Sequence, residues 1–283
     1  MRFIVRYMKT FFSGCLMGIA GIIPGVSSGT VAVISGVYPE MISSLNALTT
    51  KKMKKRGPAL FLVILVVGMG LATFLFAGIM ERLMAVEGER MSLFFIGLII
   101  GSIPLLYRKM QTYGHHDRLK PLRLIPMMAA FMLVFWINTH QGEPRHPLTS
   151  VTIAVIAVMF LAGIISSAAG LFPGISGSMV LLALGIYSTM IHALTNFHLI
   201  LLIALALGAF SGFILCSRLI HYLLVHHAGW SYSVIIGFLL ASALFLWPGF
   251  TVFEGFVFIS GCVFIFLLGF ALAMVLGGER SHA

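Results

Sequence analysis

Charged residues are scarce in this chain. Asp, Glu, Lys and Arg make up 9% of its 283 residues, whereas about a quarter of a soluble domain is charged. Hydrophobic residues make up 60%, and the mean hydropathy is +1.07. These values exclude an ordinary soluble domain and indicate a polytopic membrane protein, for which the bilayer takes the place of water as solvent.

Cysteines and acidic residues are too few and too scattered for most kinds of catalytic or metal site. The three cysteines, Cys15, Cys216 and Cys262, lie singly in apolar runs without CxxC spacing, so neither a disulfide framework nor a metal site is expected. Only eight acidic residues are present, and they form no HExxH motif and no paired carboxylates. We therefore expect that the protein is not an enzyme and uses no metal or cofactor.

Basic residues outnumber acidic ones, and the formal net charge is +10. They occur mainly in short loops between apolar runs, where they set membrane topology and contact anionic lipid rather than nucleic acid. With a cytoplasmic N-terminus, fifteen of the eighteen Lys and Arg residues fall on the cytoplasmic side, and the exceptions are Arg82, Arg90 and Arg145. The sequence therefore predicts a multi-pass protein with both termini in the cytoplasm.

Ten apolar segments follow one another along the chain. The first five span 6–23, 27–47, 59–84, 91–107 and 122–139. The second five span 150–171, 176–194, 198–224, 231–248 and 253–277. We expect an all-α polytopic membrane protein with a single transmembrane domain over 1–283.

A motif in the first half returns in the second. Residues 18–42 read GIAGIIPGVSSGTVAVISGVYPEMI, and residues 168–191 read AAGLFPGISGSMVLLALGIYSTMI. An offset of 149 positions matches Pro24 with Pro173, Gly25 with Gly174, Ser27 with Ser176, Gly36 with Gly185, and Tyr38 with Tyr187. Further along, an offset of 140 matches Gly68 with Gly208 and Ser102 with Ser242. The sequence predicts two five-segment repeats, over 1–140 and 148–278, and the odd number of segments inverts the second relative to the first.

The Pro-Gly break in each repeat favours a helical hairpin that enters the membrane and returns. Irregular backbone at membrane depth is tolerated only where it is buried in protein or lines a wet cavity. The arms beside Pro24 and Pro173 are short for a full span, which needs about 20 residues. We prefer two re-entrant hairpins that enter from opposite faces and meet near the midplane. Full spans on both sides of each break are the alternative.

Ser, Thr and Gly residues follow each Pro-Gly break and precede an apolar run of helix length. Backbone N–H groups at a helix N-terminus attract anions, hydroxyls add donors, and glycine lets an anion approach the backbone closely. Two facing tips would make a site suited to a phosphate or carboxylate. The alternative is that these residues only cap and pack the broken helices. The candidate binding residues are Gly25, Ser27, Ser28, Gly29, Thr30, Gly174, Ser176, Gly177 and Ser178.

Four further positions carry expectations. Arg218 lies within an apolar run, where a charge is costly, and two interpretations are open: binding of the substrate, or extension to the cytoplasmic surface. Glu40 follows the first motif and could carry a proton, hold an arginine, or lie exposed at the membrane boundary. For Gly36 and Tyr38 we expect a small residue at a helix contact and an interfacial tyrosine.

The paired motifs, PGVSSGT with GVY and PGISGS with GIY, resemble those of the polyprenyl-phosphate transporter family, also filed as domain-of-unknown-function family 368. The resemblance covers nearly the whole chain. Two positions depart from the family pattern, because Ser28 stands where glycine is usual and Pro39 separates Tyr38 from Glu40.

The resemblance implies a flippase that returns undecaprenyl phosphate from the outer to the cytoplasmic leaflet of the bacterial inner membrane. The carrier lipid would thereby be recycled for peptidoglycan and other envelope glycans, with its phosphate held between the two hairpin tips. The alternative is a secondary transporter or channel for a small water-soluble anion. A membrane enzyme acting on lipid phosphate is disfavoured because no nucleophile or metal site appears in the sequence.

Overall fold

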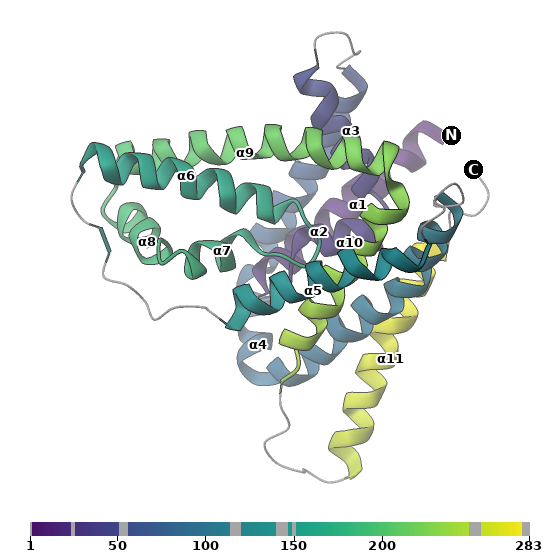
Figure 1. Ribbon diagram of the computed structural model, residues 1–283. Helices are drawn as coiled ribbons and strands as arrows, with labels where there is room; N and C mark the ends of the chain where they lie inside the picture. The colour runs from purple at the N-terminus through teal and green to yellow at the C-terminus, as the bar shows by residue number, and fades with distance from the viewer. Residues whose placement is uncertain are drawn as a thin grey trace.

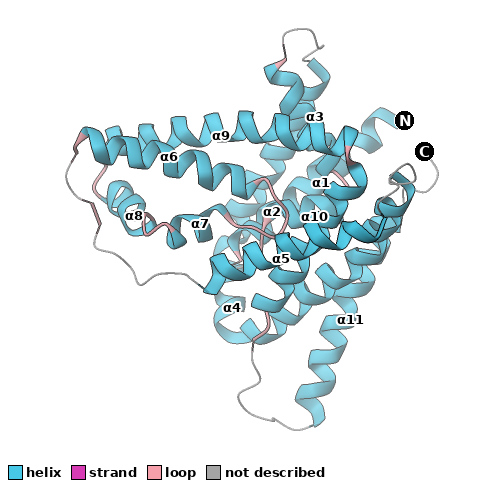
Figure 2. Ribbon diagram, in the orientation of Figure 1, coloured by secondary structure: helices cyan, strands magenta, loops and turns pink. Residues whose placement is uncertain are grey.

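The computed structural model describes residues 2–23, 26–50, 56–113, 120–139, 147–148, 151–248 and 256–278. Within these ranges all regular structure is helical, and Figure 2 shows helices joined by short loops. Six helices are long and apolar enough to cross a membrane, or eight if each of two bent pairs counts as one span. The prediction of an all-α, multi-pass membrane protein is confirmed.

The described residues of the first half form five α-helices and one short 3-10 helix. The long helix α4 contains two apolar stretches, Arg56–Met80 and Arg82–Thr112, which agrees with the two segments predicted there, and a non-helical residue, Glu87, lies near the start of the second stretch. The bounds are α1 (Arg2–Ile22), α2 (Ser28–Ile34), α3 (Tyr38–Thr49), α4 (Arg56–Tyr113), η1 (Lys120–Arg123) and α5 (Leu124–Thr139).

Six α-helices are formed by the part of the second half that the structure describes, and each of the five predicted segments there corresponds to a helix or a helix pair. A single residue, His227, separates the helix that ends at His226 from the helix that begins at Ala228. The bounds are α6 (Ile153–Gly170), α7 (Gly177–Ala183), α8 (Tyr187–Thr195), α9 (Leu199–His226), α10 (Ala228–Phe245) and α11 (Phe256–Gly278).

The helix pairs α2–α3 and α7–α8 are sharply bent, by 115° and 109°. Gly36 and Gly185 lie at these bends with φ of 69° and 70°, a left-handed conformation that glycine adopts without steric cost. Gly36 N–H donates to Val33 O at 3.0 Å and Val37 N–H to Ala32 O at 2.9 Å, which satisfies the carbonyls at the end of α2. Gly36 therefore terminates a helix, a role that was not predicted from the sequence, and the expected helix contact stays a prediction.

The pairs α1–α4 and α6–α9 pack backbone against backbone at equivalent positions. A Cβ added at Gly68 of α4 would collide with the carbonyl oxygen of Phe11 in α1. A Cβ at Gly208 of α9 would collide in the same way with Phe160 of α6. Phe11 and Phe160 are 149 positions apart, and Gly68 and Gly208 are 140 positions apart, so the two contacts join equivalent residues of the two halves. The two halves thus share local packing, whereas their inversion in the membrane stays a prediction.

The fifth segment of each half packs on the fourth segment of the other half. Gly97 in α4 meets the backbone of Phe266 in α11, and Gly237 in α10 meets the backbone of Met127 in α5. Figure 1 shows α11 alongside α4 and α5 alongside α10. In α10, 61% of the apolar span is buried, compared with 17% in α11. The halves therefore interlock, with α10 among the inner helices.

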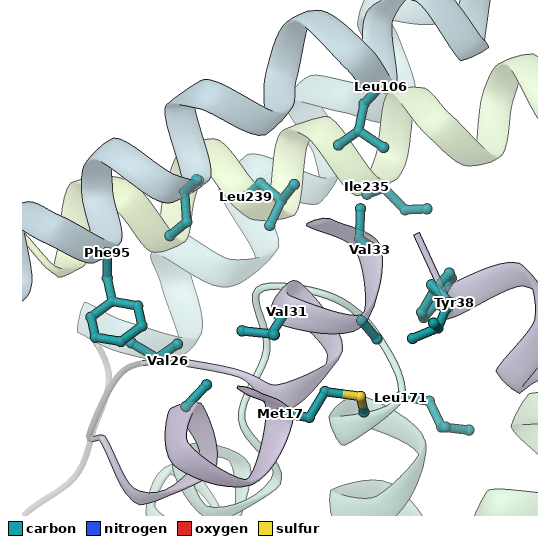
Figure 3. Packing of buried hydrophobic residues seen from close by; sticks show 14 of the residues in the cluster. Met17, Val26, Val31, Val33, Tyr38, Phe95, Leu106, Leu171, Ile235 and Leu239 are labelled. Carbon is teal, nitrogen blue, oxygen red and sulfur yellow. The ribbon is translucent and has the colours of Figure 1, made fainter. Parts of the chain in front are cut away.

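The largest cluster of buried hydrophobic residues surrounds α2. Figure 3 shows Val31 and Val33 of α2 facing side chains from several other helices. The short helix after the first Pro-Gly break is therefore enclosed by protein. The labelled residues of the cluster are Met17, Val26, Val31, Val33, Tyr38, Phe95, Leu106, Leu171, Ile235 and Leu239.

The close approach of α1 and α4 gives a first prediction. Gly68→Ala should lower the free energy of unfolding by about 1–3 kcal/mol, because the added methyl group forces two backbones apart. Gly70→Ala, two residues away in the same helix, meets no atom within 4 Å and is the matched control. Thermal unfolding in detergent should separate the two variants. Equal midpoints would show that the α1–α4 backbone contact is not required.

Candidate functional site

The first tip is the turn between α1 and α2. Ser27 is the N-cap of α2, and its Oγ accepts the N–H of Gly29 at 3.2 Å. The hydroxyl of Ser28 donates to the carbonyl oxygen of Met17 in α1 at 2.9 Å. Because a serine hydroxyl has one hydrogen to donate, Ser28 joins two helices here. Gly25, also a predicted binding residue, lies outside the described residues.

The second tip, between α6 and α7, has equivalent geometry but different exposure. Ser176 is the N-cap of α7 and has almost the same backbone conformation as Ser27, with φ of −96° and ψ of 131°. Its Oγ lies 2.8 Å from the Oγ of Ser178 and makes no cap hydrogen bond. Ser178 is exposed and Ser176 is partly exposed, whereas Ser27 is buried. The second tip therefore offers the more accessible hydroxyls.

In each half, one serine side chain forms a hydrogen bond between the helix before the tip and the helix after it. The donor side chain is on the second helix of the pair in the first half and on the first helix in the second half. In the first, the side chain of Ser28 donates to the backbone of Met17. In the second, the side chain of Ser166 donates to the backbone of Gly177 at 2.9 Å. Ser166 is the sequence equivalent of Met17, and Gly177 is the equivalent of Ser28. Ser28, which stands where the family usually has glycine, thus has a structural role, and Gly177 takes part in the equivalent hydrogen bond of the second tip.

The two tips touch. The N–H of Gly174 donates to Oγ1 of Thr30 at 2.9 Å, and its carbonyl accepts the hydroxyl of Ser242 at 2.6 Å. A Cβ at Gly29 would lie 3.5 Å from Cα of Pro173. Gly174 itself has φ of 86° and lies too close to the backbone of α10 for any side chain. Residues far apart in the sequence therefore form one buried junction.

This junction changes the roles that the sequence predicted for the donors. The N–H of Gly174 is taken by Thr30 in this conformation, so it is not available to an anion. Ser27 and Thr30 both accept backbone N–H groups, and an accepting hydroxyl can still donate its own hydrogen. Ser176 and Ser178 bond to each other, so none of these four hydroxyls donates to the backbone in the described hydrogen bonds.

Arg218 does not contact the tip residues in any described hydrogen bond. Its Nε donates to Oγ1 of Thr49 at 3.2 Å, and its Nη2 donates to the carbonyl oxygen of Thr49 at 3.0 Å. Thr49 is the last residue of α3, where carbonyl groups lack helical partners and the helix dipole favours a cation. Arg218 on α9 therefore caps α3, which was not among the interpretations that the sequence offered.

Glu40 forms an ion pair with Arg6 of α1. Of the three roles open from the sequence, holding an arginine is the one found. The side chain of Arg6 is 58% exposed and that of Glu40 33% exposed, so the pair contributes little to stability. It joins the start of α1 to the first turn of α3, at the opposite end of α1 from the tip.

Two buried side chains outside the tips were not anticipated as such. Tyr38 is 2% exposed rather than interfacial, and its hydroxyl has no hydrogen-bond partner among the described residues. Arg123, counted in the sequence as a loop residue, is 3% exposed and donates to the carbonyl oxygen of Met110 at 3.3 Å. The position of Arg123 at the start of the apolar segment 122–139 could have indicated that it is buried. Nothing in the sequence around Tyr38 indicated burial.

Metal ligands do not gather in the described parts of the chain: no group of three or more His, Cys, Asp or Glu side chains there could hold an ion. The arrangement at the tips is therefore one of hydroxyl and backbone groups. Groups of this kind are donors suited to an anion, and the described tip residues pair no nucleophile with a base.

Comparison with known proteins places the chain in a family. A family model described as VCA0040-like, undecaprenyl phosphate translocase-like, matches residues 17–261. A polyprenyl-phosphate transporter from Staphylococcus aureus is 31% identical over 271 residues, covering 93% of this chain and 94% of the relative. A polyprenyl-phosphate transporter from Vibrio cholerae is 28% identical over 255 residues, covering 86% of this chain and 79% of the relative.

No solved structure matches the chain. The family match spans both tips and all of α2 to α10, so it includes every described residue of the junction. The resemblance read from the paired motifs is confirmed, and this protein belongs to the undecaprenyl phosphate translocase-like family.

Proposed function

We propose that this protein is a flippase that carries undecaprenyl phosphate from the outer to the cytoplasmic leaflet of the bacterial inner membrane. Membership of a polyprenyl-phosphate transporter family supports the lipid substrate. The observation that carries the mechanism is the direct contact of the two tips through Gly174 and Thr30. The returned carrier would then be available again for peptidoglycan and other envelope glycans.

The phosphate head group is held between the tips. Ser176 and Ser178 receive it first, because their hydroxyls are more accessible than the buried hydroxyls of Ser27 and Thr30. Ser27 and Thr30 then donate from the buried side, and the anion competes with the bond between Thr30 and Gly174. Charge-assisted hydrogen bonds are about twice as strong as neutral ones, so a phosphate can separate groups that neutral contacts hold together.

The isoprenoid chain stays in the lipid while the head group crosses. Only the charged end is costly to place in the membrane, so protein groups need to accompany only that end. Two hairpins that enter from opposite faces would give the head group access to each side in turn. The excess of Lys and Arg at the predicted cytoplasmic loops supports an orientation with both termini in the cytoplasm.

The exposed side of the junction gives a second prediction. Ser176→Phe should reduce transport at least about tenfold, because the ring fills the space that the phosphate needs. Proteoliposomes that contain undecaprenyl phosphate would report transport as protection of the outer-leaflet lipid from an impermeant phosphatase. Thr195→Phe, at an exposed position near the end of α8, is the control for adding a ring to the second half. Undiminished transport by Ser176→Phe would rule out the tip as the binding site.

The same vesicles separate the two candidate functions. Uptake of radiolabelled inorganic phosphate, with no change in the lipid, would instead support a transporter for a small water-soluble anion.

The contact between the tips gives a third prediction. Thr30→Val keeps the shape of the side chain but leaves the buried N–H of Gly174 without its acceptor. The free energy of unfolding should fall by about 1–3 kcal/mol. Thr30→Ser retains the hydroxyl and should stay close to the parent protein. Chemical unfolding in detergent measures both variants, and a Thr30→Val variant as stable as the parent protein would show that the hydrogen bond between the tips is not required.

A further inference from the structure

A groove of about 470 Å³ lies between α3 and α9, two helices that Figure 1 shows in contact. Its volume is within the range of about 300–1,000 Å³ that is typical of sites for small molecules. The described residues that line it belong to neither tip. The groove therefore joins the second helix of the first hairpin to a helix of the second half, away from the predicted path of the phosphate.

The lining of the groove changes from polar to apolar along α9. Ser217 and Arg218 are consecutive, whereas Phe210 comes eight residues before Arg218, a rise of about 12 Å in an α-helix. Phe210 is 66% exposed and Phe213 is 40% exposed, and α9 is one of the helices long and apolar enough to cross a membrane. The apolar end of the groove is therefore open to the hydrocarbon of the bilayer.

Arg218 brings a positive charge to the groove, and no acidic side chain offsets it in the described part of the chain. Neither a glutamate nor an aspartate is among the described lining residues, and the described ion pairs do not involve Arg218. A guanidinium group has five N–H donors. Thr49 accepts from two of them, so three N–H groups remain to bind a further acceptor.

The cap of α3 does not by itself explain an arginine at this position. The equivalent helix of the second half, α8, is capped by its own Asn196, whose Nδ2 donates to the carbonyl oxygen of His192 at 3.0 Å. The offset of 140 positions places Gly78 of α4 opposite Arg218, so the repeat does not require a cation here. Because a charge within an apolar run is costly, Arg218 needs a partner beyond Thr49.

A phosphate group is the acceptor that best matches a guanidinium, because paired, charge-assisted N–H···O bonds form between them. In a bilayer, a phosphate attached to hydrocarbon chains is the head group of a phospholipid. One guanidinium balances one negative charge, which is the charge of a phosphodiester. A phosphate monoester carries about −1.5 to −2 near pH 7. The charge of the groove therefore favours a phosphodiester.

We infer that the groove between α3 and α9 binds one anionic phospholipid of net charge −1. The phosphodiester accepts from the remaining N–H groups of Arg218, and an acyl chain lies along Phe213 and Phe210. A lipid in this position holds the first hairpin against the second half of the chain. Because such a ligand binds only the folded protein, it stabilises the folded state.

Native mass spectrometry of the delipidated protein in detergent tests the inference. Phosphatidylglycerol should saturate one site per chain at least about tenfold more tightly than phosphatidylcholine, whose phosphate charge is balanced by choline. It should also raise the midpoint of thermal unfolding, in proportion to the occupied fraction of the site. Equal affinity for the two lipids would overturn the assignment to an anionic phospholipid.

Two variants with matched controls locate the site. Arg218→Gln should weaken phosphatidylglycerol at least about tenfold, whereas Arg108→Gln, at an exposed position of α4, should bind as the parent does. Arg218→Gln also removes the cap of α3, so a second variant must leave that cap in place. Leu48→Trp fills the groove and should weaken the lipid to a similar extent. Leu71→Trp, at an exposed leucine of α4, is its control.

Unchanged affinity in either groove variant would overturn the site. Equal losses in Leu48→Trp and Leu71→Trp would show a layer of lipid around the protein instead of a bound molecule.

Competition distinguishes the sources of phosphate. Inorganic phosphate should not displace phosphatidylglycerol, because it makes no contact with the apolar wall. Farnesyl phosphate, a short prenyl phosphate, should displace it only at concentrations at least about tenfold higher. Displacement by inorganic phosphate alone would overturn the assignment to a lipid. Tighter binding of farnesyl phosphate would assign the groove to a prenyl phosphate and overturn the phospholipid.

Discussion

Backbone groups inside a bilayer have no water to bond with, and this constraint governs the broken helices on which the rest of the structure depends. Each break exposes N–H and carbonyl groups that the protein itself must satisfy. Gly36 and Gly185 close the ends of α2 and α7 with paired backbone hydrogen bonds. Thr30 accepts the N–H of Gly174 from the opposite hairpin. The two hairpins therefore satisfy a backbone hydrogen-bond donor of one with a hydroxyl of the other. This contact is at the place where they would have to separate to admit a substrate.

The sequence was sufficient to predict the helical segments and their repetition, because hydrophobic runs and Gly-Pro breaks are local signals. It could not predict which segments pack together across the halves. The contacts of Gly97 with Phe266 and of Gly237 with Met127 join positions with no common local pattern. Nor could it predict the bend at Gly36, because a glycine at a helix contact and a glycine at a helix end look alike in one sequence.

The candidate site was predicted in outline only. Proximity of the tips was expected from the paired motifs, but the partner of each hydroxyl depends on distances that a sequence does not contain. Ser28 therefore bonds with α1, and Thr30 occupies a donor that was assigned to the substrate. Arg218 illustrates the same point, since its position in an apolar run indicated function while its side chain caps α3. Charge near a helix end can be structural wherever carbonyl groups need a donor.

The packing of α11 on α4 and of α5 on α10 bears on how such a chain could arise by duplication. A half-length ancestor would present the glycine face of its fourth segment with no helix of its own to cover it. Two copies of such a half would cover these faces by exchanging their fifth segments. In a single chain that contains both halves, this exchange is permanent and each half depends on the other for its packing.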